Sequence, residues 1–113
     1  MPVYHESITK TAVSKAALEV VLPPRELSVM PRRALSFTNS GTLPLADAKI
    51  QLGPTPDGPW FDEDLTSHAL LTLAAGASCV YRMDRVDHYL QVQAQGGAGE
   101  GQSDLTICID ALG

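Results

Sequence analysis

The sequence is poor in aromatic residues, charged residues and long apolar runs. No stretch of about 18 consecutive apolar residues occurs, so we expect no membrane-spanning helix. The 113 residues include one Trp, three Tyr and two Phe, too few to fill a core and also present several exposed rings to sugars. Charged residues make up 19% of the chain, and the net charge is −5. Because nucleic acid repels a negatively charged chain, we expect no nucleic-acid partner.

Cysteine is also scarce. Cys79 and Cys108 are the two cysteines of the chain, and they form no C-x-x-C pair. The N-terminal residues lack the basic and apolar segments of a secretory signal, so nothing indicates an oxidising compartment. We therefore expect free thiols that pack within strands, although a disulfide between facing strands stays open.

What the chain does have is a series of short apolar segments separated by turn residues. Hydrophobic residues are 44% of the total, and a chain of this length buries roughly 65% of its unfolded surface, which supports one core. Turn residues recur about every 8 to 12 positions, a spacing typical of β-sandwiches. The sequence predicts an all-β fold: a small antiparallel β-sandwich over residues 14–113, immunoglobulin-like as first choice and jelly-roll as second. An extended N-terminal arm is predicted over residues 1–13.

Alternation of apolar and polar residues predicts the individual strands. The clearest alternation begins at Ala46, where every second residue up to Leu52 is apolar. The first strand is expected to end at Pro23-Pro24, because proline cannot donate to a strand ladder. The last strand is expected to form an open sheet edge that a partner could pair with. The predicted strands cover residues 16–22, 33–38, 46–52, 78–83, 88–95 and 105–109.

Two connecting regions are less regular. Residues 53–59 contain three Pro and two Gly, which predicts a proline-stiffened loop. Trp60 and Phe61 follow this loop and are expected to cover the edge of the core. Residues 62–75 fit either a helix or a strand over residues 68–73, and the β-rich surroundings favour the strand.

The densest group of metal-ligand residue types is Asp57, Asp62, Glu63, Asp64 and His68. Calcium requires several oxygens that converge from one loop, and the spacing of an EF-hand is absent. The sequence therefore predicts a solvated acidic loop and no metal site. A metal held by His68 together with the carboxylates is the alternative.

No arrangement of residues indicates catalysis. The nucleophile motif G-x-S-x-G is absent, and His5, His68 and His88 are scattered along the chain without a neighbouring nucleophile. Residues 96–101 hold four glycines and predict a flexible hairpin loop; no helix follows that could complete a phosphate site. We expect no enzyme activity, no catalytic residue and no cofactor.

The arginines are the main candidates for charged contacts. Arg25, Arg32, Arg33, Arg82 and Arg85 could form basic patches. The planar guanidinium pairs well with carboxylates, so such patches would bind acidic groups on neighbouring subunits. Scattered, solvated charge is the alternative.

Two stretches resemble known families. Residues 36–45 (SFTNSGTLPL) with the strand after them resemble the N-x-G-T strand-turn-strand of bacterial immunoglobulin-like domains. Residues 73–78 (LAAGAS) resemble the L-x-x-G-x-S turn of the same domains. The same layout, with DGPW at residues 57–60 and YLQVQA at residues 89–94, resembles small virion structural proteins of tailed phages, of the decoration type.

The resemblance implies a capsid decoration protein or another virion-surface component, made in the host cytoplasm and located in the virion. Its partners would be itself or other virion proteins, such as a major capsid protein. From the residues, the polar arm and the low charged fraction predict a homo-oligomer or lattice-bound subunit, joined through the arm and one sheet face. The alternative function is an immunoglobulin-like binding module for carbohydrate or a host surface protein. Whether the protein belongs to a phage head, to a tail or to no virus stays open.

Overall fold

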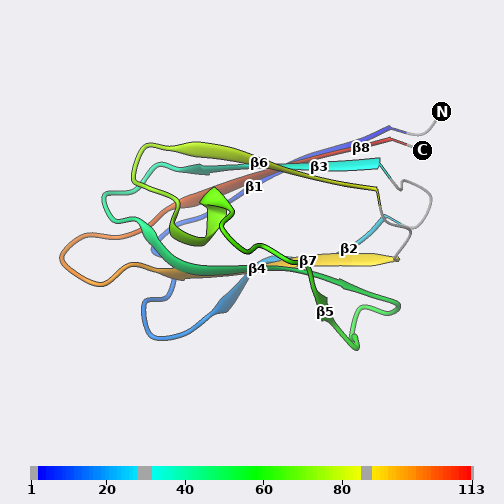
Figure 1. Cartoon of the computed structure of the whole chain (residues 1–113), viewed down its shortest axis with the longest axis horizontal. Helices are drawn as coiled ribbons and strands as arrows, with labels where there is room; N and C mark the ends of the chain where they lie inside the picture. Colours follow the sequence, from blue (N-terminus) through cyan, green and yellow to red (C-terminus); the bar gives the residue numbers. More distant parts are fainter. Residues whose placement is uncertain (1–2, 28–31, 85–87, 113) are drawn as a thin grey trace.

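The computed structural model describes residues 3–27, 32–84 and 88–112. Two sheets of four strands each lie face to face in this part of the chain (Figure 1), which confirms the predicted antiparallel β-sandwich. One sheet contains β1 (Val3–Lys10), β8 (Leu105–Leu112), β3 (Arg32–Asn39) and β6 (Ser78–Asp84), in that order. The other contains β2 (Glu19–Glu26), β7 (Tyr89–Gly96), β4 (Leu45–Gly53) and the short β5 (Phe61–Asp62).

The strand order is that of a jelly roll, the second of the two predicted topologies. In the immunoglobulin order, the first two strands are neighbours in one sheet. Here β1 pairs with β8, and β2 pairs with β7 in the opposite sheet, so the first and last strands are adjacent. Turn motifs such as N-x-G-T indicate where the chain reverses but not which sheet it enters next. For this reason they could not separate the two topologies.

The core lies between the sheets and consists of the inward residues of every long strand. The alternation predicted for residues 33–38, 78–83, 88–95 and 105–109 is confirmed by the burial of those residues. In residues 46–52 the predicted alternation is confirmed from Ala48 onward. Ala46 is exposed, because a register shift between Leu45 and Asp47 turns Leu45 inward instead. Fully buried side chains at the centre include Leu35, Phe37, Ile50, Leu90, Val92, Ile107 and Ile109.

The predicted N-terminal arm is part of the sandwich. Residues 3–10 form β1, which pairs antiparallel with β8 along its full length, from Val3 opposite Leu112 to Lys10 opposite Leu105. Tyr4 and Ile8 point inward and pack against the core. The segment is extended, as expected, but it is an edge strand rather than a free arm. Only Val3, Tyr4 and Ile8 of its residues are apolar, and they do not alternate regularly, so the sequence pattern is too weak to separate a strand from an arm.

Two further predictions about edges were wrong. β2 continues through Pro23-Pro24 to Glu26, with register shifts on both sides of Leu22. This is possible because β2 is an edge strand, where proline leaves no ladder bond broken. The terminal strand β8 is not an edge, because it lies between β1 and β3.

Residues 68–73 form neither the preferred strand nor a long helix. A single turn of 3₁₀-helix, η1 (Ala69–Thr72), lies there, with His68 as its N-cap. The His68 Nδ1 accepts from the Leu70 amide at 3.0 Å, and its Nε2 lies 3.2 Å from the Val80 carbonyl of β6. η1 buries Leu70 in the core, and His68 lies against the outer edge of β6.

The glycine-rich segment after β7 crosses between the sheets and is therefore not a hairpin. It packs closely against residues 41–44: the Thr42 and Leu43 amides both donate to the Gln102 carbonyl. The absence of a side chain at Gly97 is required here, because a Cβ would lie 2.3 Å from the Pro44 carbonyl oxygen. Glycine therefore allows a close approach of two loops at this position.

The open side of the sandwich at β1 and β2 is closed by an ion pair. Arg25 Nε and Nη2 donate to the two carboxylate oxygens of Glu6 at 2.7 and 2.9 Å, and the Tyr4 hydroxyl donates to the same carboxylate. These donors, Arg25 first, lower the pKa of Glu6. Glu6 belongs to one sheet and Arg25 to the other, so this cluster links the two layers.

Candidate interaction face

The outer surface of the β1–β8–β3–β6 sheet is the feature that stands out, and we call it the outer face. Strand register sets its residues in four rows that cross the sheet. Most of its side chains are short. Among the described side chains, the rows are Thr9–Thr106–Thr38–Ser78, Ser7–Cys108–Ser36–Val80, His5–Asp110–Ala34–Arg82 and Val3–Leu112–Arg32.

Neighbouring hydroxyls on the outer face bond to each other. The Thr9 and Thr106 hydroxyls lie 2.9 Å apart, and so do those of Thr38 and Ser78. In the third row, His5 Nδ1 lies 2.6 Å from Asp110 Oδ1, and both side chains are largely exposed. Cross-strand bonds of this kind hold the side chains against the sheet, and the surface is therefore ordered before any partner arrives.

Apolar groups are also exposed on this face. Val3 is 70% exposed, Val80 43% and Leu112 41%, which makes them three of the five most exposed large apolar residues of the described chain. Val3 and Leu112 are cross-strand neighbours at one end of the face, whereas Val80 lies on the opposite edge strand. An exposed apolar pair of this kind is a small candidate contact area, and a single exposed apolar residue needs no explanation.

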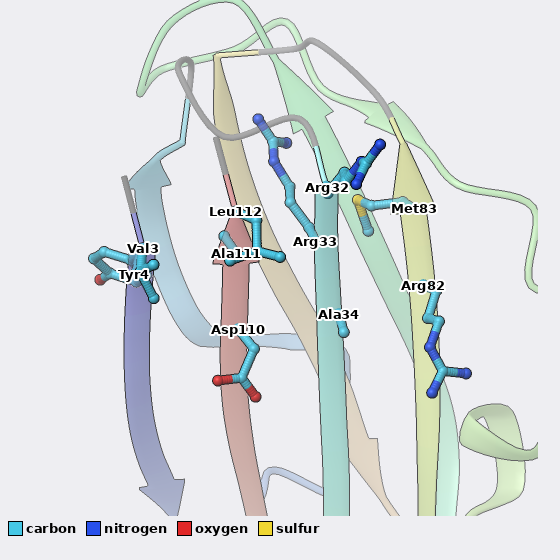
Figure 2. Close-up of a pocket in the computed structure, with 10 residues that line it drawn as sticks. All are labelled: Val3, Tyr4, Arg32, Arg33, Ala34, Arg82, Met83, Asp110, Ala111 and Leu112. Atoms are coloured by element: carbon cyan, nitrogen blue, oxygen red, sulfur yellow. The ribbon is translucent and has the colours of Figure 1, made fainter. Parts of the chain in front are cut away.

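One end of the outer face is hollowed. Figure 2 shows Ala34 at the middle of this end, with longer side chains around it on the neighbouring strands. The hollow measures about 420 Å³. Its outward side chains are apolar at Val3 and Leu112, basic at Arg32 and Arg82, and acidic at Asp110, which lies beside Ala34 (Figure 2). We call it the hollow, and we define it by its outward residues, which are Val3, Arg32, Ala34, Arg82, Asp110 and Leu112.

The five arginines that the sequence suggested as a basic patch have different surroundings. Arg25 is committed to Glu6, and Arg33 points inward, is buried and donates to the Leu27 carbonyl at 2.7 Å. Arg32 and Arg82 are exposed at the hollow, while Arg85 lies outside the described residues. Only part of the predicted basic patch therefore exists in the described chain, as one pair of exposed guanidinium groups.

The acidic group does not converge on one point. Asp62 accepts from Gln51 at 2.8 Å, and Asp64 accepts from the Thr66 amide and hydroxyl, which lowers the pKa of Asp64. His68 uses both ring nitrogens within the fold, as described above. In residues 3–27, 32–84 and 88–112, no three His, Cys, Asp or Glu side chains form a group that could hold a metal ion. His5 and His88 lie far from this loop in the chain, and both are exposed.

The two cysteines lie on opposite faces of one sheet. Cys79 points inward and packs against the core, and burial raises the pKa of its thiol. Cys108 points outward in the middle of the outer face, with its thiol 3.4 Å from the Ser7 hydroxyl. β3 lies between their strands, which places them about 10 Å apart, beyond the reach of a disulfide. Both are free thiols, and the open possibility of a bond between them is removed.

The outer surface of the second sheet is built differently. Gln91 Nε2 donates to Gln51 Oε1 at 2.7 Å, and Gln51 Nε2 donates in turn to Asp62. Both glutamine side chains are buried although they point away from the core. Trp60 lies over Gly53 at the end of β4, while Phe61, expected to cover the core, is 59% exposed.

Known structures share this fold but are distant in sequence. Neither protein families nor curated proteins give a match to the chain. The SPBc2 prophage-derived protein YomS superposes with a TM-score of 0.59 at 11% identity, covering 100% of this chain and 96% of that one. PirA superposes with a TM-score of 0.58 at 19% identity, covering 94% and 93%. The fold is therefore one that a prophage-derived protein also adopts, and at these identities the likeness shows the fold alone.

In the described part of the chain, no helix is long and apolar enough to cross a membrane. Association through one sheet face was predicted from the sequence, but which residues make up that face was not. Its signal is the run of Ser, Thr and other short residues at many of the outward positions of β1, β3, β6 and β8. That signal becomes visible only when the strand order brings these positions together.

Proposed function

We propose that this protein is a non-enzymatic structural component of a tailed-phage particle that attaches to other virion proteins through its outer face. The observation that carries the proposal is the outer face: a sheet surface of mostly short side chains, with hydroxyl pairs bonded across strands and with exposed Val3, Val80 and Leu112. A surface of short side chains allows close packing of another protein over a wide area. A capsid decoration protein is the specific role we propose.

Two further points support this proposal. Jelly-roll sandwiches occur in viral capsid proteins, and one structure of the same fold is prophage-derived; both are fold-level analogies. In the described chain, the histidines, cysteines and carboxylates either bond to neighbouring residues or lie apart from one another. A structural role is consistent with this arrangement, because it requires no cluster of such groups. We propose accordingly that the protein has no enzyme activity and requires no cofactor.

Particles purified from the organism that encodes the chain provide the test. We expect the protein to be present in them at a copy number comparable to that of a capsid or tail protein, as measured by quantitative mass spectrometry. Added back to particles that lack it, the Ser36→Lys variant should bind at least tenfold more weakly than the native protein, because a lysine in the middle of the outer face prevents close contact. The matched control is Gln93→Lys, which adds the same charge to the outer surface of the other sheet. Absence from purified particles, or equal binding of both variants, would contradict the proposal.

A carbohydrate-binding module is the second candidate, favoured by Trp60 and Tyr89 near the ends of β4 and β7. Jelly rolls also include lectin domains. However, Gln51 of β4 and Gln91 of β7 already bond to each other and are buried, so these two amides are not free to bind sugar hydroxyls. Glycan-array binding that is lost in Trp60→Ala but unaffected by Ser36→Lys would establish this second candidate in place of the first.

A further inference from the structure

The two sheets end in four edge strands, and three of these edges carry features that hinder pairing with a further strand. β2 contains Pro23-Pro24, which lack the N–H groups that such pairing needs. β5 has two residues, and the edge of β4 beyond it is covered where the Leu45 amide donates to the Leu73 carbonyl. On β6, the His68 side chain occupies the Val80 carbonyl. Features of this kind keep a sheet edge from pairing with other chains.

Within the described chain, β1 carries none of these features. It has eight residues, contains no proline or glycine, and pairs with β8 without a register shift. Figure 2 shows it as the outermost strand, with the sheet continuing on the β8 side only. Arg25 of the other sheet reaches β1 through its side chain and bonds to Glu6. The open edge that the sequence predicted for β8 therefore lies one strand farther out, at β1.

Two charged residues on the inner side of β1 restrict what can pair with this edge. Glu6 lies opposite Ile109 of β8. Lys10 lies opposite Leu105, and both of these β8 residues face the core. Inward charges on an edge strand discourage pairing with an arbitrary strand, because the new neighbour would cover them without a partner. The edge therefore favours a strand that brings the opposite charge to each of these two positions.

We propose that β1 of one copy pairs antiparallel with β1 of a second copy, with Ile8 opposite the partner's Ile8. In this register Glu6 lies opposite the partner's Lys10, and Lys10 lies opposite the partner's Glu6, so two opposite-charge pairs form. A pairing centred on Glu6 would set the two carboxylates against each other. A pairing centred on Ser7 would place Lys10 opposite the partner's Tyr4. The sequence of β1 therefore selects a second copy of itself in one register.

The Glu6 carboxylate has room for the additional donor. A carboxylate offers about four acceptor positions, and Arg25 and Tyr4 use three of them. Main-chain groups supply most of the contact, since donors meet acceptors along the whole paired edge. An edge of eight residues is a small interface compared with the standard of about 800 Å² per partner. We therefore expect a dimer that dissociates on dilution.

The pairing rests on the proposed function and extends it. Because inward residues meet inward residues, the two-fold axis is perpendicular to the β1–β8–β3–β6 sheet, and two sheets of four strands join into one of eight. The outer faces of both copies then lie on the same side, where both can contact one particle. Two linked contacts bind more tightly than one, so the dimer strengthens attachment through the outer face.

Sedimentation velocity of the full chain over a range of concentrations tests the two charge pairs. Lys10→Glu sets carboxylates against each other, and Glu6→Lys sets ammonium groups against each other. Each variant alone should therefore dimerise about tenfold more weakly than the native protein. An equal mixture should form a one-to-one dimer of native-like affinity, because opposite charges then meet at both positions. Lys49→Glu, on β4 of the other sheet, is the matched control and should dimerise normally. Circular dichroism checks that each variant is folded.

Hydrogen exchange of the native protein is a second measurement, which needs no variant. Along an antiparallel strand, every second residue directs its amide toward the same neighbour. Every second amide of β1 should therefore exchange about tenfold more slowly in concentrated protein than in dilute protein. The amides between them already bond to β8 and should change little.

Three results would overturn the pairing. These are a native protein that stays monomeric at high concentration, a Lys10→Glu variant that dimerises as well as Lys49→Glu, and exchange at β1 that does not depend on concentration. A monomer whose β1 amides are protected only on particles would assign the edge to a particle protein in place of a second copy. Ser36→Lys, two strands away from β1 in the sheet, should dimerise normally while binding particles weakly. Failure of the pairing is therefore distinguishable from failure of the proposed function.

Discussion

The outer surfaces of the two sheets have the same architecture but opposite use of their polar groups. On the β2–β7–β4–β5 sheet, Gln91, Gln51 and Asp62 form a chain of hydrogen bonds in which the two glutamines are buried and Asp62 is exposed. On the outer face, the side chains are short, and apolar residues such as Val80 remain exposed. Buried amides that bond to each other stabilise the fold, whereas the hydroxyl pairs of the outer face lie at exposed positions, where their bonds contribute less to stability. The comparison predicts that substitutions on the first surface change stability and those on the second change attachment to particles.

Breaking the glutamine chain should give the largest effect on stability. Gln51→Ala leaves the buried Gln91 amide without its acceptor and removes a donor from Asp62, so we expect a loss of about 2 kcal/mol in the free energy of unfolding. Urea denaturation followed by tryptophan fluorescence measures it. Ser36→Ala, at a half-buried position on the outer face, should change the same quantity by no more than about 0.5 kcal/mol. Equal effects of the two substitutions would show that the two surfaces do not differ in this way.

The ion pair between Glu6 and Arg25, which links the two sheets, should contribute less to the free energy of unfolding. Glu6→Gln removes the charge that Arg25 and Tyr4 bind, and we expect a loss of about 1 kcal/mol at pH 7, since the ion pair is partly solvated. The folded-state pKa of Glu6 lies below its ordinary value of 4.5. The stabilisation that the Glu6 charge contributes is therefore complete above the ordinary pKa of about 4.5. It is lost as the pH falls through the folded-state pKa of Glu6.

Thermal unfolding of Glu6→Gln and the native protein between pH 3 and 7 checks this expectation. The two melting curves should converge at the acidic end of the range. A difference between them that stays constant with pH would mean that Glu6 acts through packing and not through its charge.

The sequence predicted the sandwich and most of its strands, because alternation reports which residues face the core. It failed where the outcome depends on distant partners. β1 carries too few apolar residues to be distinguished from an arm, and only its pairing with β8 makes it a strand. β8 was expected at an edge because nothing local shows that β1 covers it. The outer face and the hollow combine the first and last strands with β3 and β6 from the interior of the chain, so no single segment could reveal them.

The same limit applies to the acidic loop and the arginines. Their residue types were recognised, but local bonds decide what they do. Asp64 is occupied by Thr66, and Arg33 is buried against Leu27, while Arg32, one position earlier, faces outward. A shift of one residue in a strand reverses the side on which a charge lies, and the run of arginines alone does not show which one is exposed.

The smallest expected effect is a difference in thiol reactivity between the two sides of one sheet. Cys108 lies in the second row of the outer face, whereas Cys79 points into the core side, where burial raises the pKa of its thiol. We expect iodoacetamide at pH 8 to alkylate Cys108 several-fold faster than Cys79, since only the thiolate reacts and access favours the outer side. Peptide mass spectrometry of a time course measures both rates in one sample, and denatured protein should show both sites alkylated. When the protein is bound to particles, only the Cys108 rate should fall, because a partner on the outer face covers that row and leaves Cys79 unchanged. A Cys108 rate that does not respond to binding would place the partner elsewhere on the molecule, even if Ser36→Lys weakens attachment.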